Sequence, residues 1–277
     1  MKAWVLIIFI FLLFNVHTAI RASEKTNSLW GATAGYMLTS DYADERSPRL
    51  YENKVFLFLS GKFLPYQITT TLKGGITFNT LGNSIYEENP DSNGFHVTDT
   101  ILVFTKTLEL AKANPHFIGS HQLTPMLFNI FPTSDSSRYA GYRASPGAQA
   151  ILSSTFWDGY YNLKNGVNII KVFNTYSHNP ATHNPSPSLM SVFEQDHTFK
   201  LGLGFSVGAG FSFKYSKDES GNTNTTFENT ASLEYAYKAF GASLVYSGGD
   251  HTTNDKVELW YVDNTRKILT LVLTYTI

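Results

Sequence analysis

Eight histidines are the residues of this chain best suited to nucleophilic or acid–base chemistry. A histidine that activates a serine on a β-strand needs that serine two residues later, where both side chains share a face. No histidine here is followed by serine at that spacing, and Ser177-His178-Asn179 holds these residue types in the wrong order within a proline-rich stretch. The histidines are His17, His96, His116, His121, His178, His183, His197 and His251. We therefore expect no catalytic residue and no enzymatic activity.

Metal, cofactor and nucleic-acid sites have equally little support. The chain has no cysteine, which excludes thiolate ligands, and His178 and His183 lie five residues apart beside several prolines, as in a solvated loop. The glycines of residues 202–210 are not a phosphate-binding loop, because no helix is expected after them. Lys and Arg total 21 against 22 Asp and Glu, which leaves no basic excess for phosphates. We expect no metal, no cofactor and no nucleic-acid partner.

A two-residue alternation is the strongest pattern in the chain. From Phe199 to Tyr215 every odd position is apolar, and every even position is glycine, serine or lysine. Alternation with this period predicts a β-strand with one apolar and one polar face. We interpret the stretch as a single strand of seventeen residues, longer than the roughly 9 to 11 residues that cross a membrane.

Charged residues on the polar faces of such segments are the candidate functional residues. In a membrane-spanning barrel those faces would line a wet lumen. The pair Glu234 and Lys238, four residues apart, would present both signs of charge and set a weak ion preference, or would only solvate and stiffen the wall. The lumen-facing candidates are Lys73, Lys200, Lys214, Glu228, Glu234 and Lys238.

The first 22 residues have the pattern of a secretory signal peptide. Lys2 precedes an apolar run from Ala3 to Phe14, and Ala19 and Ala22 are small residues suited to cleavage. Twelve apolar residues cover about 18 Å as a helix, too little for a hydrocarbon core of about 30 Å. We therefore expect residues 1–22 to be removed and residues 23–277 to form a single domain.

The C-terminal segment Ile268–Ile277 alternates again and ends the printed sequence. Its apolar face holds Leu269, Leu271, Leu273, Tyr275 and Ile277. This strand resembles the C-terminal assembly signal of bacterial outer-membrane β-barrel proteins, although Ile277 replaces the commoner terminal phenylalanine. The resemblance implies the bacterial outer membrane as location, its lipids as neighbours, and recognition by the barrel-assembly machinery.

The expected fold is an all-β, antiparallel transmembrane β-barrel of about 12 strands, an even number as in bacterial barrels. One conflict accompanies this count and leaves ten or fourteen strands as alternatives. With both termini periplasmic, residues 217–223 and 248–255 would be periplasmic and the tight turn at 237–240 external, against the usual short-inside rule. The expected strands are 28–40, 49–64, 66–80, 97–110, 122–133, 147–160, 166–176, 197–215, 225–238, 240–248, 256–262 and 266–277.

Several central segments are apolar on both faces, for example Val55–Leu59 and Met126–Phe131. Their inward residues would fill the barrel, line a passage for hydrophobic molecules, or belong to a surface that packs against a sister barrel and holds lipid. The polar, small-residue faces favour a porin-like channel for passive diffusion of small solutes. The alternatives are a non-conducting homo-oligomeric structural barrel and a transporter of hydrophobic molecules such as fatty acids or aromatics.

Overall fold

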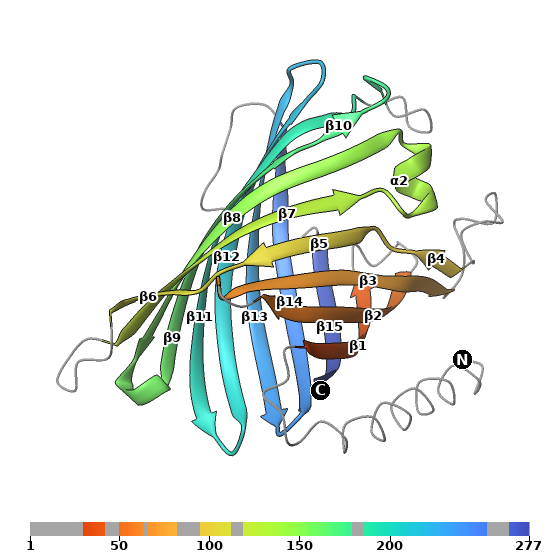
Figure 1. The fold of residues 1–277 in the computed structure, drawn as a ribbon. Coiled ribbons are helices and arrows are strands. Elements are labelled where there is room, and N and C mark those ends of the chain that lie inside the picture. Colours follow the sequence, from red (N-terminus) through yellow and green to blue (C-terminus); the bar gives the residue numbers. More distant parts are fainter. Residues whose placement is uncertain are drawn as a thin grey trace.

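The computed structural model describes residues 30–41, 50–63, 66–81, 95–111, 119–178, 185–253 and 266–276. Nearly all of them lie in strands that follow one another around a single sheet (Figure 1). A short helix, α2 (Asp135–Tyr139), and a 3-10 turn, Trp157–Gly159, connect strands. The strands are β1 (Trp30–Asp41), β2 (Leu50–Phe63), β3 (Ile68–Leu81), β4 (Phe95–Val97), β5 (Thr100–Thr105), β6 (Leu108–Ala111), β7 (Ser120–Phe131), β8 (Tyr142–Phe156), β9 (Tyr161–Lys171), β10 (Phe173–Asn174), β11 (Pro187–Gly202), β12 (Phe205–Asp218), β13 (Thr223–Tyr237), β14 (Phe240–Thr253) and β15 (Arg266–Thr276).

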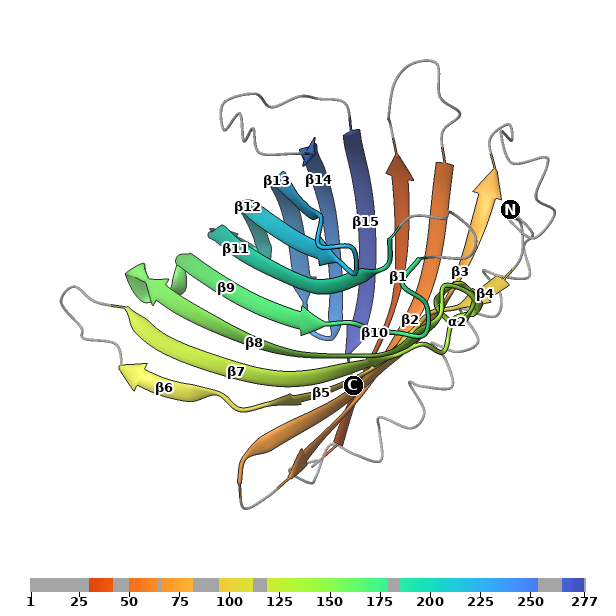
Figure 2. The same ribbon diagram turned by 90° about the horizontal axis from the view of Figure 1, so that it is seen from above.

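The sheet closes on itself as an antiparallel barrel. β15 pairs with β1 from Thr33↔Thr276 to Asp41↔Ile268, and the ring continues through β2, β3 and β5 to β7 and β8 (Figure 2). The short strands β5 and β6 both pair with β7 and act as one interrupted barrel strand, while β4 extends the edge of β3 and β10 that of β8. The result is a closed 12-strand barrel, which confirms the predicted fold class.

The predicted seventeen-residue strand at 199–215 is wrong. The chain reverses there in a tight hairpin, with positive φ at Gly202, Leu203 and Gly204, so that Phe199 faces Val207 across the pair β11–β12. The register shifts by one residue between Lys200 and Gly202, so that residues of the same parity face each other, as Lys200 and Ser206 do, and the alternation continues through the reversal. Glycine at 202 and 204 makes the left-handed backbone accessible.

The total of twelve strands is met, although residues 199–215 belong to two strands instead of one. The segment 256–262, expected to be a strand, lies outside the described residues. β14 and β15 pair directly with each other along ten positions, from Phe240↔Tyr275 to Gly249↔Arg266. The barrel ring therefore has no place for another strand between them.

The two ends of the barrel differ in the length of their connections. The turns at 203–204 and 238–239 lie at the lower end in Figure 1, together with the C-terminal end of β15. The turn at 157–160 and the eight-residue connection 112–119 belong to the same end. The connections at the other end include residues 42–49, 82–94, 172–186 and 254–265. Residues 219–222 belong to that end, so the expected conflict with the short-inside rule is resolved: the tight turns are the periplasmic ones.

Large apolar side chains stand exposed on alternate positions around the outside. Leu57, Leu59, Leu72 and Ile76 on β2 and β3 are each more than two-fifths exposed. Aromatic side chains are exposed near the periplasmic turns, among them Trp30, Trp157 and Tyr237. An apolar band with aromatic residues at its edge is the lipid-facing surface of a transmembrane barrel. Within the described ranges, no helix has the length and apolarity needed to cross a bilayer.

Candidate functional site in the barrel interior

The inner face of the barrel can be traced through strand register. Met37, Lys54 and Val272 line one cavity, and Met37 is the register partner of both other residues. From Val272 the same face continues through Ser243 on β14, Glu234 on β13, Ser206 on β12 and Lys200 on β11. Because residues directly opposite in a sheet share a face, these positions define the interior wall.

One half of this wall is polar. It runs over β8, β9, β11, β12 and β13, where small residues separate charged ones. Both signs of charge are present, so this half carries no single strong field. Its inward charged residues include Lys164, Glu194, Asp196, Lys200, Lys214, Glu228 and Glu234.

Lys214 and Glu228 form an ion pair across β12 and β13, with 2.5 Å between Nζ and Oε2. Their side chains are 49% and 28% exposed. An ion pair this accessible to water contributes at most about 1 kcal/mol to stability. Its larger effect is on the electrostatic potential in the lumen, because the pair holds one positive and one negative group at a fixed position on the inner wall.

Glu194 is the centre of a second polar group. The Gln149 Nε2 donates a hydrogen bond of 3.0 Å to Glu194 Oε1, and the carboxyl lies over Gly166 on the neighbouring strand. A Cβ atom at residue 166 would overlap Glu194, so glycine there makes room for the carboxyl. Sequence reasoning missed Glu194 and Asp196 because β11 was not extended back to Pro187. It missed Lys164 because residues 161–165 were left between two expected strands, and Gln149 lies in an expected strand but carries no charge.

The opposite half of the wall is apolar where β2, β5 and β7 contribute to it, and β3 between them presents Thr71, Lys73 and Gly75. Phe56 is 8% exposed and Val103 is 6% exposed, the lowest values among the inward side chains of this half. Phe58, Ile101, Phe128 and Ile130 face the same way by register. Bulky side chains therefore narrow the lumen from one side only.

These rings pack over glycines of adjacent strands. A Cβ atom on Gly35 of β1 would overlap the Phe56 ring, and one on Gly147 of β8 would overlap the Phe128 ring. The register places Gly35 opposite Phe56 and Gly147 opposite Phe128. Glycines beside each ring, rather than the glycines of 202–210 across the barrel, make the space for the apolar wall.

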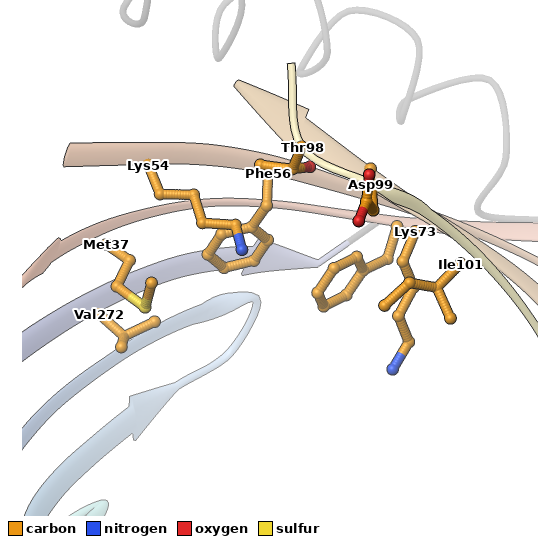
Figure 3. A pocket seen from close by; sticks show the side chains of 10 residues that line it. Met37, Lys54, Phe56, Lys73, Thr98, Asp99, Ile101 and Val272 are labelled. Carbon is orange, nitrogen blue, oxygen red and sulfur yellow. The ribbon is translucent and has the colours of Figure 1, made fainter. Parts of the chain in front are cut away.

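The apolar wall contains a cavity of about 300 Å³ (Figure 3). The Phe56 and Phe58 rings are stacked with centroids 4.9 Å apart. Lys73 Nζ lies 5.2 Å from the centroid of the Phe58 ring, within range of a cation–π interaction. Lys54 and Asp99 complete the charged groups at this cavity.

The connection between β7 and β8 is fastened near the same cavity. Asp99 accepts hydrogen bonds from the Ser134 backbone N–H at 2.9 Å and from the Ser137 hydroxyl at 2.5 Å. The Ser134 hydroxyl accepts from the Ser137 N–H at 3.2 Å and so caps α2.

The six lumen-facing candidates do not form one cluster. Lys214 and Glu228 are paired, Lys73 lies across the barrel on the apolar wall, and Lys200 and Glu234 occupy inward positions toward the periplasmic end. Lys238 lies in the two-residue turn after β13 with φ of 52°, and its Nζ is 5.2 Å from the Tyr237 ring centroid. It is therefore not part of the strand wall, and the expected pairing with Glu234 on one strand face has no geometric basis.

The C-terminal strand lies at the barrel seam. Leu269, Leu271, Leu273 and Tyr275 share the face of β15 opposite to Val272, while Ile277 lies outside the described residues. His183 lies outside them as well. Over the described ranges, no group of three or more metal-ligating side chains is close enough to hold a metal ion.

No protein-family model matches the chain, and no curated protein sequence matches it. Solved structures with a similar fold include two outer-membrane proteins. An outer-membrane channel from Pseudomonas putida F1 is 12% identical, with a TM-score of 0.59 over 91% of this chain and 97% of that chain. The NanC porin is 13% identical, with a TM-score of 0.50 over 87% of this chain and 98% of that one.

The fold is that of a bacterial outer-membrane β-barrel. Closed barrel, apolar outer band and this likeness together locate the protein in the bacterial outer membrane, as predicted. At such low identity the likeness concerns the fold, so the function is argued from the interior wall of this chain.

Proposed function

We propose that the protein is a porin-like channel for passive diffusion of small solutes, without enzymatic activity. The observation that carries the proposal is the polar half of the inner wall, where small and charged residues follow one another over five neighbouring strands. Such a wall keeps water in the lumen, because its groups are hydrated in place. Mixed charge favours weak ion selectivity over strong binding.

The test is single-channel conductance of the folded protein in a planar bilayer, with the heat-dependent gel shift of barrels as the proof of folding. Discrete ohmic steps support the proposal. The variant Lys214→Gln removes a positive charge from the wall, so the reversal potential in a KCl gradient should shift in the direction of greater cation selectivity. Lys217→Gln, three residues along β12 on the outward face, is the matched control and should leave it unchanged. A folded barrel that never conducts contradicts the proposal.

A second candidate is a non-conducting homo-oligomeric barrel that packs against copies of itself and holds lipid. The apolar wall of Phe56, Phe58 and Phe128 favours it, because these rings narrow the lumen. Particle mass in mild detergent tests it, together with the amount of co-purified lipid. A strictly monomeric particle without bound lipid contradicts this candidate.

Export and assembly follow from the same proposal. Residues 1–22 serve as a cleaved signal peptide, residues 23–277 form the barrel domain, and the alternating C-terminal strand is recognised by the barrel-assembly machinery. N-terminal sequencing of protein purified from the outer membrane tests the first part. A mature chain that still begins at Met1 contradicts it.

A further inference from the structure

The cavity on the apolar wall combines two cations with aromatic surface. Lys54 on β2 and Lys73 on β3 line it from neighbouring strands (Figure 3). Among the described residues, neither ammonium lies within 4.0 Å of a carboxylate. Two positive groups without ion-pair partners on a mostly apolar wall attract an anion, since both remain available to a ligand.

The negative charge of Asp99 limits how many negative charges the bound anion can carry. Asp99 is the carboxylate at the cavity, and its two oxygens already accept hydrogen bonds from Ser134 and Ser137. Two ammonium groups and one carboxylate leave a net charge of one positive unit. A ligand with one negative charge neutralises the site, whereas a dianion adds repulsion with Asp99.

The rest of the cavity selects an apolar body for this anion. Met37, Phe56, Phe58, Ile101 and Val272 supply its surface. The stacked Phe56 and Phe58 rings offer a face for a further ring in offset stacking. A volume of about 300 Å³ is at the lower end of the range for small-molecule sites.

We infer that this cavity is a binding site for small organic monocarboxylates with an aromatic or compact apolar body. The ammonium groups of Lys54 and Lys73 attract the carboxylate, and the body packs on the Phe56 and Phe58 rings. The inference deepens the proposed channel function, because it names the class of solute that the lumen retains during passage. Neutral alcohols of the same shape lack the group that the lysines recognise.

The experiment is titration calorimetry of the full, folded barrel in detergent, with benzoate, cyclohexanecarboxylate and benzyl alcohol as probes. We expect both carboxylates to bind and benzyl alcohol to bind at least about tenfold more weakly. Lys54→Met and Lys73→Met keep the apolar stems and should each weaken benzoate binding about tenfold. Lys217→Met on the outer face is the matched control and should leave the affinity unchanged.

Phe58→Leu separates stacking from charge. It should weaken benzoate more than cyclohexanecarboxylate, because only benzoate stacks on the ring. Equal affinity for benzoate and benzyl alcohol, or unchanged benzoate affinity in both lysine variants, overturns the inference. If a barrel that never conducts binds benzoate, the binding site is upheld and the channel function is contradicted. If the barrel conducts but does not bind benzoate, the channel function is upheld and the binding site is contradicted.

Discussion

The ring of Phe128 on β7 lies directly against Gly147 on β8, its register partner. A residue without a side chain lets the neighbouring aromatic ring lie flat on the sheet and cover the exposed backbone. Phe56 and Gly35 repeat this arrangement at the β1–β2 pair. The apolar wall is thereby thin, and space in the lumen depends on small residues beside large ones.

Adding a methyl group at this contact should destabilise the barrel. In Gly147→Ala the new Cβ overlaps the Phe128 ring, so the ring must rotate into the lumen or the strands must separate. We expect the free energy of unfolding to fall by about 1–3 kcal/mol, measured by urea titration of the gel shift. Phe128→Leu in the same chain should recover part of the loss. No recovery in the double variant would show that the ring is not the cause.

The ion pair Lys214–Glu228 should affect selectivity more than stability. Glu228→Gln removes one negative charge from the polar wall, so the reversal potential in a KCl gradient should shift toward anions. The free energy of unfolding should change by no more than about 1 kcal/mol, since the pair is exposed. Glu219→Gln, in the turn beyond β12, is the control. A large loss of stability with unchanged selectivity would contradict this assignment.

The turn after β12 should hold its geometry in mild acid. Partial desolvation acts to raise the pKa of Asp218, but hydrogen bonds from the Asn222 side chain and backbone and from the Ser220 and Gly221 backbone outweigh it, so the pKa lies below the ordinary 3.8. A lowered folded-state pKa adds stability that is present above the unfolded value and lost as pH falls through the folded value. The carboxyl resonance of Asp218 in micelles should therefore titrate with a midpoint under 3.8. A midpoint at or above that value would refute the hydrogen bonding.

Releasing Asp99 should loosen the connection that contains α2. Asp99→Ala removes the acceptor of the Ser134 N–H and the Ser137 hydroxyl, bonds of a kind that contribute about 1.5–3 kcal/mol each. Amide hydrogen exchange of residues 132–141, followed by mass spectrometry, should accelerate while exchange in β11 and β12 stays unchanged. Asp158→Asn in the opposite turn serves as the control. Equal protection in both variants would rule out this fastening role.

The two ends of the barrel should be distinguishable on intact cells. An epitope inserted after Gly221 should bind antibody without permeabilisation, because residues 219–222 lie at the end with the long connections. An epitope inserted between Lys238 and Ala239 should bind only after the outer membrane is opened. The reverse result would invert the orientation assigned to the barrel.

Much of this fold could be predicted from the two-residue alternation and the turn residues. β1, β2, β3, β13 and the C-terminal strand lie within a few residues of their expected positions, because each alternates over its length between recognisable turns. The hairpin at 203–204 could not be found this way. Its turn residues continue the alternation, and Leu203 is 94% exposed although it fits the apolar series.

The interior was harder to predict than the strands. Lys214 and Glu228 share a face in sequence, but their ion pair depends on the register between β12 and β13. The cavity joins Met37, Lys73 and Val272 from both ends of the chain, and only barrel closure brings them together. No pattern within one segment contains that information.

Closure also dictates when the seam can form. Its pairs join residues about 240 positions apart, as in the Thr33 and Thr276 hydroxyls at 3.3 Å. Hairpins such as β11–β12 close loops of a few residues, and their entropic cost is smaller. The last bond-forming event in folding is thus the meeting of the first and last strands. Before it, two rows of unpaired backbone groups would face hydrocarbon, so complete synthesis must precede stable residence in the lipid.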